Sequence, residues 1–358
     1  TRLASQCGDG VMQAGVAWLV LLSPDAQRTP GAFAGVLALV LLPFSAVGPF
    51  AGTVLDRWSR RNILVGGQLL RTVVVLAIAA VAATTTGATA AAYTLVLVAL
   101  GINRLLLAAL SAAIPHTVPA RHLVEANAVA PTAGTVSTGV GLALGAVVLA
   151  TGASSAVVLL VGSVAYVAAA ALAARFPAGS LGPDTGTRPP AVRDVFPDLA
   201  AAMNHLLARR AAAGALARLG AFRLVFGAWT LWVFELTAGR SDDRNAAVVA
   251  VLAAAGYGAA AVVTPFAAGR LGLFRWTGWL LAGLTVITLG SLVPGGPAAW
   301  AVQAFAFGLG GQTLKIQTDT TVQSDVAEAY LGRTFTLYDV LFNVCFVAGA
   351  LATALALG

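Results

Sequence analysis

The sequence predicts an all-α polytopic membrane protein, and three observations support this fold class. Of the 358 residues, 59% are hydrophobic and only 10% are charged, with a mean hydropathy of +0.87. Such a chain has too little polar surface for a water-soluble globule. Its apolar runs continue for about 20 residues, the length that a helix needs to cross a bilayer core. They lack the period-two alternation of transmembrane strands, so the spans are helices.

Eleven apolar runs are expected to be membrane-spanning helices. Proline, glycine and charged residues separate the runs and mark the loops between them. Pro115 and Pro119, for example, end the fourth run, because two prolines within five residues stop a helix. The predicted spans are residues 2–22, 31–55, 62–83, 91–113, 127–150, 154–174, 211–237, 246–269, 276–293, 297–318 and 334–357.

A polar segment divides these spans into two groups. Residues 175–210 are rich in Pro, Gly, Asp and Arg, and no apolar run there exceeds a few residues. Its second part, 195–210, has apolar residues at helical spacing and predicts an amphipathic helix on the membrane surface. We therefore expect a helical bundle over 1–174, a cytoplasmic linker over 175–210 and a second bundle over 211–358. Two bundles of six helices need a twelfth helix, which is expected beyond residue 358.

The arginines predict the orientation in the membrane. If the amino terminus is cytoplasmic, thirteen of the 21 Lys and Arg residues fall at cytoplasmic ends of spans and three at outer ends. Lys and Arg are retained on the cytoplasmic side during insertion. Topology thus accounts for the net charge of +7, and no nucleic-acid partner is expected. The excess of Arg over Lys is typical of a GC-rich bacterial genome, so we expect the protein in a bacterial inner (plasma) membrane. We also expect it to be a monomer in contact with membrane lipids.

A charged loop joins the second and third predicted spans. Within it, Gly52, Asp56, Arg57, Arg60 and Arg61 fit the pattern Gly-x-x-x-Asp-Arg-x-x-Arg-Arg. This pattern resembles the loop between helices 2 and 3 of the major facilitator superfamily. The segments 118–128 and 325–333 resemble those of its macrolide-efflux-like and drug:proton antiporter exporters. The resemblance implies two six-helix bundles that open alternately to each side of the membrane.

The same loop is a candidate conformational latch. Asp56 could cap the positive amino-terminal end of the eleventh span near Arg333 and so hold the two halves together on the cytoplasmic side. The alternative is that Asp56 and Arg57 only fix the topology. In the fifth span, Gly141 and Gly145 resemble part of the antiporter signature. Small residues four apart also let helices pack closely, so a packing role alone would explain them.

Charged residues inside the spans are candidates for substrate binding or proton coupling. A charge at bilayer depth costs several kcal/mol unless it is paired or hydrated. In the family that this chain resembles, helices 1, 4, 7 and 10 line the central cavity, and all but one of the candidates lie in these helices; Arg71, in the third, is the exception. The candidates are Asp9, Arg71, Arg104, Arg223, Lys315 and Asp319.

Each candidate also has a structural interpretation. Asp9 is either a structural partner of Arg71 or Arg104 or a proton-titrating carboxylate. Lys315 and Asp319 are four residues apart on one helical face and are expected to pair with each other. Arg104 lies far from either membrane surface, and its setting resembles the helix 4 arginine that the superfamily associates with proton coupling. It is therefore the first candidate for that role.

These features predict a secondary transporter and no enzyme. The chain has no phosphate-binding GxxxxGK[ST] loop, so a proton gradient is the expected energy source, with no cofactor and no metal site. Cations outnumber acids inside the spans, which favours export of small amphiphilic compounds that are anionic or zwitterionic over cationic drugs. A lipid or lysophospholipid flippase on the same fold is the alternative. An intramembrane enzyme, or a receptor or scaffold without transport, is the remaining class.

Overall fold

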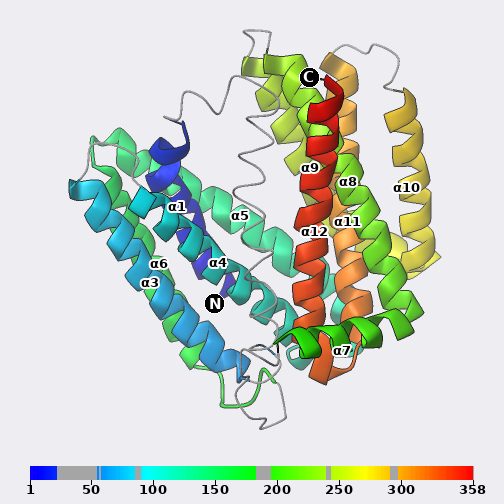
Figure 1. Ribbon diagram of the computed structural model, residues 1–358, viewed down its shortest axis with the longest axis horizontal. Helices are drawn as coiled ribbons and strands as arrows, with labels where there is room; N and C mark the ends of the chain where they lie inside the picture. The colour runs from blue at the N-terminus through cyan, green and yellow to red at the C-terminus, as the bar shows by residue number, and fades with distance from the viewer. Residues whose placement is uncertain are drawn as a thin grey trace.

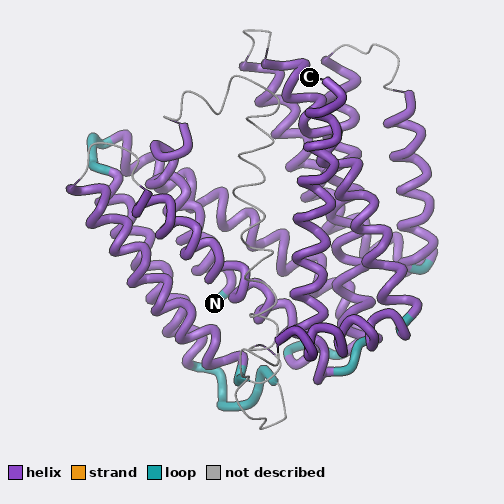
Figure 2. The backbone as a smooth tube through the Cα atoms, viewed as in Figure 1, coloured by secondary structure: helices purple, strands orange, loops and turns teal. Residues whose placement is uncertain are grey.

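The protein is helical throughout the part of the chain that the computed structural model describes, which is residues 1–21, 55, 58–84, 90–182, 195–238, 243–290 and 297–357. Short turns join the described helices (Figure 2). Most of the predicted span 31–55 lies outside the described residues, as do Gly52, Asp56 and Arg57. The helices are α1 (Arg2–Leu21), α3 (Arg60–Thr84), α4 (Ala90–Ala113), η1 (Ile114–His116), η2 (Ala120–His122), α5 (Leu123–Ala150), α6 (Ser155–Ala174), α7 (Val195–Ala208), α8 (Arg210–Ala238), α9 (Asp243–Leu271), α10 (Leu273–Gly290), α11 (Pro297–Asp325) and α12 (Glu328–Leu357).

The composition of these helices confirms an all-α membrane fold. Seven of the described helices are long and apolar enough to cross a bilayer, and α10 is a shorter apolar helix. Large apolar side chains point outward, with Val73 63%, Val164 66% and Val262 75% exposed. An exposed apolar surface of this extent suits lipid and does not suit water. The helix α11 is less apolar because it buries a row of polar side chains, including Gln312, Gln317 and Asp319.

Two helices extend furthest beyond the apolar runs that predicted them. The run 297–318 continues as helix to Asp325, and the run 334–357 begins at Glu328. The added turns are polar, but several of their side chains, including Thr321 and Gln323, are buried within the protein. Thr321 donates a hydrogen bond to the carbonyl of Gln317 at 2.7 Å, and Gln323 is buried against α4 and α5. Contacts between the two halves of the molecule therefore extend these helices beyond the apolar runs.

The described helices form two groups, with α1 and α3 to α6 in one and α8 to α12 in the other (Figure 1). In each group, some helices pack with their backbones in contact. A Cβ atom at Gly141 in α5 would overlap the carbonyl oxygen of Cys7 in α1, and one at Gly349 in α12 would overlap that of Leu224 in α8. Gly145 similarly faces Ala14 of α1. The α5 glycines thus lie where two helices approach closely, which only small residues permit.

The two groups meet at the end of the molecule that carries α7, seen at the bottom of Figure 1. We call this end the α7 face. There Asn127 of α5 donates a hydrogen bond to Gln323 of α11 at 2.6 Å, and Gln323 donates to the carbonyl of Ser111 in α4 at 3.0 Å. The helix α7 lies against the second group, where Asp198 pairs with Arg333 of α12 at 3.4 Å. In the predicted topology the α7 face is cytoplasmic.

Candidate functional site

A pocket of about 350 Å³ lies in the second helix group, on the side that faces α5. Phenylalanine rings from three helices form much of its wall: Phe222 and Phe226 come from α8, Phe307 from α11 and Phe342 from α12. The rings of Phe226 and Phe307 have centroids 5.6 Å apart. The polar and charged lining residues are Thr135 of α5, Arg223, Tyr257, Gln312 and Lys315. We call this the central pocket.

Arg223 is held in the pocket wall by aromatic rings. Its guanidinium carbon lies 3.7 Å from the ring centroid of Phe342 and 4.3 Å from that of Phe346. Its Nε donates a hydrogen bond to the carbonyl of Phe342 at 3.2 Å. These contacts stabilise a cation by the negative faces of the rings. None of the ion pairs seen among the described residues involves Arg223, so its charge is available to an anion in the pocket.

Lys315 and Asp319 form the ion pair that their spacing predicts, along one face of α11. The two partners differ in exposure: the Lys315 side chain is 25% exposed and that of Asp319 only 1%. Lys315 lines the central pocket, and its Nζ lies 5.6 Å from the ring centroid of Tyr338. Asp319 thus lies behind Lys315, away from the pocket. A ligand in the pocket can reach the ammonium group of Lys315, whereas Asp319 does not line the pocket.

Asp339 of α12 belongs with these charges, although the sequence analysis did not single it out. Its carboxyl group interacts electrostatically with Arg104, Lys315 and Asp319. Arg104 of α4 also acts on Arg223 of α8. The structure therefore brings three predicted cations from both halves near two carboxylates. We call Arg104, Arg223, Lys315, Asp319 and Asp339 the central charge group. An acidic residue within the apolar run 334–357 was the signal that could have identified Asp339.

Asp9 and Arg71 lie elsewhere, in a closed cluster inside the first helix group. They form an ion pair, and the Asp9 and Arg71 side chains are 5% and 0% exposed. The hydroxyl of Tyr166 in α6 donates to Asp9 at 3.0 Å, and Arg71 donates to Asn103 of α4 at 3.2 Å. The guanidinium of Arg71 also lies 4.3 Å from the ring centroid of Tyr166. None of these four residues lines the central pocket. Of the two interpretations of Asp9, the geometry supports the structural partner of Arg71.

A second set of charged residues joins the halves at the α7 face. Arg60 of α3 is fully buried and pairs with Glu328 of α12 at 2.7 Å, and His116 of η1 contacts the same carboxylate oxygen at 3.1 Å. Arg60 also donates to the carbonyls of Ala112 and Leu181 at 3.0 and 3.2 Å. We call Arg60, His116 and Glu328 the latch. It connects the first helix group to the first turn of α12.

The other predicted latch residues have different places. Arg61 donates to the carbonyl of Ala174 at 2.7 Å, within the first group. Arg333 contacts Asp198 of α7. The partners Gly52, Asp56 and Arg57 lie outside the described residues, so the contact expected between Asp56 and α12 stays a prediction. Sequence reasoning missed His116 and Glu328, because a His and a Glu in polar loops are common and only their convergence on Arg60 marks them.

The part of the chain that the structure describes contains no evident metal site. No three His, Cys, Asp or Glu side chains lie close enough there to share a metal ion. Cys7 and Cys345 are free thiols in different helix groups.

The central pocket can hold the apolar body of a ligand against its aromatic rings, with the cations Arg223 and Lys315 beside it.

Comparisons with known proteins agree with this architecture. A family model described as Major Facilitator Superfamily matches residues 8–350. Two relatives, an uncharacterized MFS-type transporter of Mycobacterium bovis and one of Mycobacterium tuberculosis, are each 34% identical over 362 residues, covering 97% of this chain and 81% of theirs.

Solved structures share the fold at low sequence identity. The human organic anion transporter MFSD10 superposes with a TM-score of 0.71 at 17% identity, covering 99% of this chain and 91% of that one. A bacterial homologue of the iron transporter ferroportin, in an outward-facing state, gives 0.66 at 16% identity over 99% and 95% of the two chains. At these identities the likeness concerns the fold alone.

Proposed function

The chain belongs to the Major Facilitator Superfamily and is one of its transporters, and from this premise we propose a more specific activity. We propose that it is a secondary transporter that works by alternating access. Its cargo is small and amphiphilic, anionic or zwitterionic, and it leaves the cell at the expense of the proton gradient. The assignment as an exporter draws on segments 118–128 and 325–333, which resemble those of macrolide-efflux-like exporters.

The central pocket is the observation that carries this proposal. Its volume of about 350 Å³ falls in the range of pockets that bind small organic molecules. Its aromatic wall suits an apolar body, and Lys315 and Arg223 suit an anionic head. The central charge group has three cations and two carboxylates, so it carries one net positive charge when all are ionised. A net positive pocket favours an anion over a cationic drug.

Alternating access is supported by the way in which the halves meet. Among the described residues, hydrogen bonds and ion pairs join the halves near the α7 face, through Gln323 and the latch. Gln312 of the central pocket also donates a hydrogen bond to Thr132 of α5 at 3.2 Å. Polar contacts of this kind can break and re-form during a conformational change. A packed apolar core cannot rearrange as readily, because it is not continuously deformable. In the predicted topology the described state is closed toward the cytoplasm. The ferroportin homologue with the same fold was solved facing outward.

Proton coupling is proposed to enter through Asp319. Its carboxylate holds Lys315, and Lys315 lines the pocket. Protonation of Asp319 would break the ion pair and change the charge that the pocket presents to a ligand. Substrate binding and proton binding are therefore linked through one lysine, as coupled transport requires.

The test uses proteoliposomes that contain a pH-sensitive dye. Aryl carboxylates, aryl sulfonates and alkyl sulfobetaines are added outside, and proton movement is recorded. Wild-type protein should move protons when an accepted anion or zwitterion is present, and Asp319→Asn should bind the ligand without moving protons. Arg121→Gln, an exposed arginine remote from the pocket, is the matched control. Proton movement that Asp319→Asn retains would remove Asp319 from the mechanism.

Two further experiments distinguish export from import, and a small anion from a lysophospholipid as the cargo. In inverted membrane vesicles with an acidic interior, an exporter should accumulate the accepted anion, whereas an importer should not. Lysophospholipids are tested in the same assay. If they alone elicit proton movement, the protein is a lysophospholipid transporter and the small-anion proposal is wrong.

A further inference from the structure

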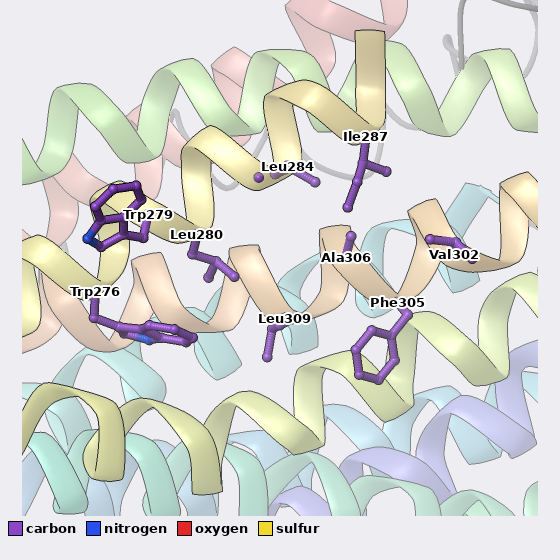
Figure 3. Close-up of a pocket in the computed structure, with 10 residues that line it drawn as sticks. Trp276, Trp279, Leu280, Leu284, Ile287, Val302, Phe305, Ala306 and Leu309 are labelled. Atoms are coloured by element: carbon purple, nitrogen blue, oxygen red, sulfur yellow. The ribbon is translucent and has the colours of Figure 1, made fainter. Parts of the chain in front are cut away.

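A second groove lies on the outer surface of the second helix group, between α10 and α11 (Figure 3). It has a volume of about 340 Å³, and its lining consists of apolar side chains and one glycine, among them Trp276, Trp279, Leu280 and Gly283 of α10 and Val302 and Phe305 of α11. The groove is separate from the central pocket, which takes Phe307 and Gly311 from another face of α11. Trp279 is 73% exposed and Val302 57%, so no described part of the chain covers this side of the groove.

The length of the groove matches one leaflet of a bilayer. Its lining on α10 extends from Trp276 to Ile287 (Figure 3). At 1.5 Å per residue this is about 16 Å, roughly half of the 30 Å hydrocarbon core. The Trp276 end is near the start of α10, which lies on the same side of the molecule as α7 (Figure 1). An acyl chain that fills the groove therefore belongs to the leaflet on the α7 side, with its head group beyond Trp276.

Three arginines lie near the start of α10, at that end of the groove. Arg270 and Arg275 flank the turn at Gly272 between α9 and α10, and both are exposed. Arg218 of α8 lies nearby, with its guanidinium carbon 5.1 Å from the ring centroid of Phe274. The sequence from residue 244 to 318 contains no Asp or Glu. Among the described residues, none of these three arginines forms an ion pair with a carboxylate.

We propose that this groove binds one anionic phospholipid. One acyl chain lies between α10 and α11, and the phosphate lies against Arg270 and Arg275. The apolar lining alone would accept the tail of any lipid, but the uncompensated arginines distinguish an anionic head group from a zwitterionic one. Two basic residues near a membrane surface together predict a preference of roughly 25-fold for the anionic lipid. This site does not depend on the transport mechanism or on the identity of the cargo.

Tryptophan fluorescence provides the test, because brominated acyl chains quench indole rings that they contact. Purified full-length protein is reconstituted in phosphatidylcholine with a small fraction of brominated phosphatidylglycerol or, separately, of brominated phosphatidylcholine. The wild-type protein should be quenched by the brominated phosphatidylglycerol at fractions where brominated phosphatidylcholine has little effect. Trp279→Phe should lose much of this quenching. Equal quenching by the two lipids at the same fraction would show an ordinary lipid-facing surface and would overturn the proposal.

Two pairs of variants separate the tail from the head group. Gly283→Leu fills the groove, and Gly278→Leu is its matched control on the same helix, because neither glycine has an atom within 4 Å of an added Cβ and only Gly283 lines the groove. Gly283→Leu should abolish the selective quenching and Gly278→Leu should keep it. The double variant Arg270→Gln with Arg275→Gln should equalise the two lipids, while Arg121→Gln should not. Selective quenching that survives in Gly283→Leu would show that the lipid binds elsewhere.

Discussion

Replacing Asp9 by asparagine tests whether this buried carboxylate is a structural partner or a proton carrier. The substitution keeps the size of the side chain and removes its charge. Arg71, which is fully buried, then loses its counter-charge. Its remaining contacts are the hydrogen bond to Asn103 and the ring of Tyr166. Neither group carries a negative charge that could replace the carboxylate.

The expected magnitude follows from this geometry. Removing one partner of a buried ion pair costs about 3–5 kcal/mol, because the other charge is left uncompensated. The Tyr166 hydroxyl donates one hydrogen bond to Asp9, so Tyr166→Phe should cost only about 1 kcal/mol. In the double variant Asp9→Asn with Arg71→Gln, no buried charge is left without a partner. The double variant should therefore cost less than the sum of the two single variants, by up to about 3 kcal/mol.

The assay is the free energy of unfolding of purified protein in mixed detergent micelles. It is measured for the wild type, for Asp9→Asn, for Arg71→Gln, for Tyr166→Phe and for the double variant of Asp9 and Arg71. Proton movement in proteoliposomes is measured on the folded fraction of each. A structural Asp9 predicts a large loss of stability and retained proton coupling. A stability within about 0.5 kcal/mol of the wild type, together with lost proton coupling, would refute the reasoning and make Asp9 the proton carrier.

Three further predictions concern packing and the α7 face. Gly141→Ala should destabilise the protein severely, because the new Cβ overlaps the Cys7 carbonyl oxygen. Its control, Gly139→Ala, should not, because a Cβ there meets no atom within 4 Å. The melting temperatures of the two variants are compared, and equal values would contradict the close helix contact. Glu328→Gln should weaken the latch and increase the labelling of cysteines placed at the α7 face, and unchanged labelling would mean that the latch does not hold this end closed. Gln323→Ala should open the same end by removing hydrogen bonds worth about 1 kcal/mol each, and distances between spin labels on α5 and α11 should then broaden; an unchanged distribution would show that other contacts suffice.

The helices of the fold could be predicted from the sequence because lipid imposes one simple requirement. A run of about 20 apolar residues must be helical in a bilayer, and every predicted span within the described residues is a helix. The ends of α11 and α12 could not be predicted in the same way. Polar residues such as Gln323 suggest the end of a span, yet here they lie against the other half of the protein. Tertiary contacts thus set the helix length where apolarity does not.

The candidate site was predictable as a set of charges but not as a geometry. The rule that buried charges need partners identified Asp9, Arg104 and Lys315. Sequence spacing could pair Lys315 with Asp319, since both lie on one helix. It could not decide whether Asp9 joins Arg71 or Arg104, because that depends on how separate helices are placed. Asp339 was missed for a related reason, since a single acid in a long apolar run gains meaning only from the cations around it.

The measurement that most directly tests the central claim is a ligand-binding comparison at the central pocket. Purified wild-type protein, Lys315→Gln and Arg223→Gln are screened by thermal shift against amphiphiles that share one aromatic body and carry an anionic, zwitterionic or cationic head. Anionic and zwitterionic members should stabilise the wild type and lose their effect in both variants. Stabilisation by the cationic members alone, or equal stabilisation of the wild type and the variants by the anionic ones, would contradict an anion site at Lys315 and Arg223.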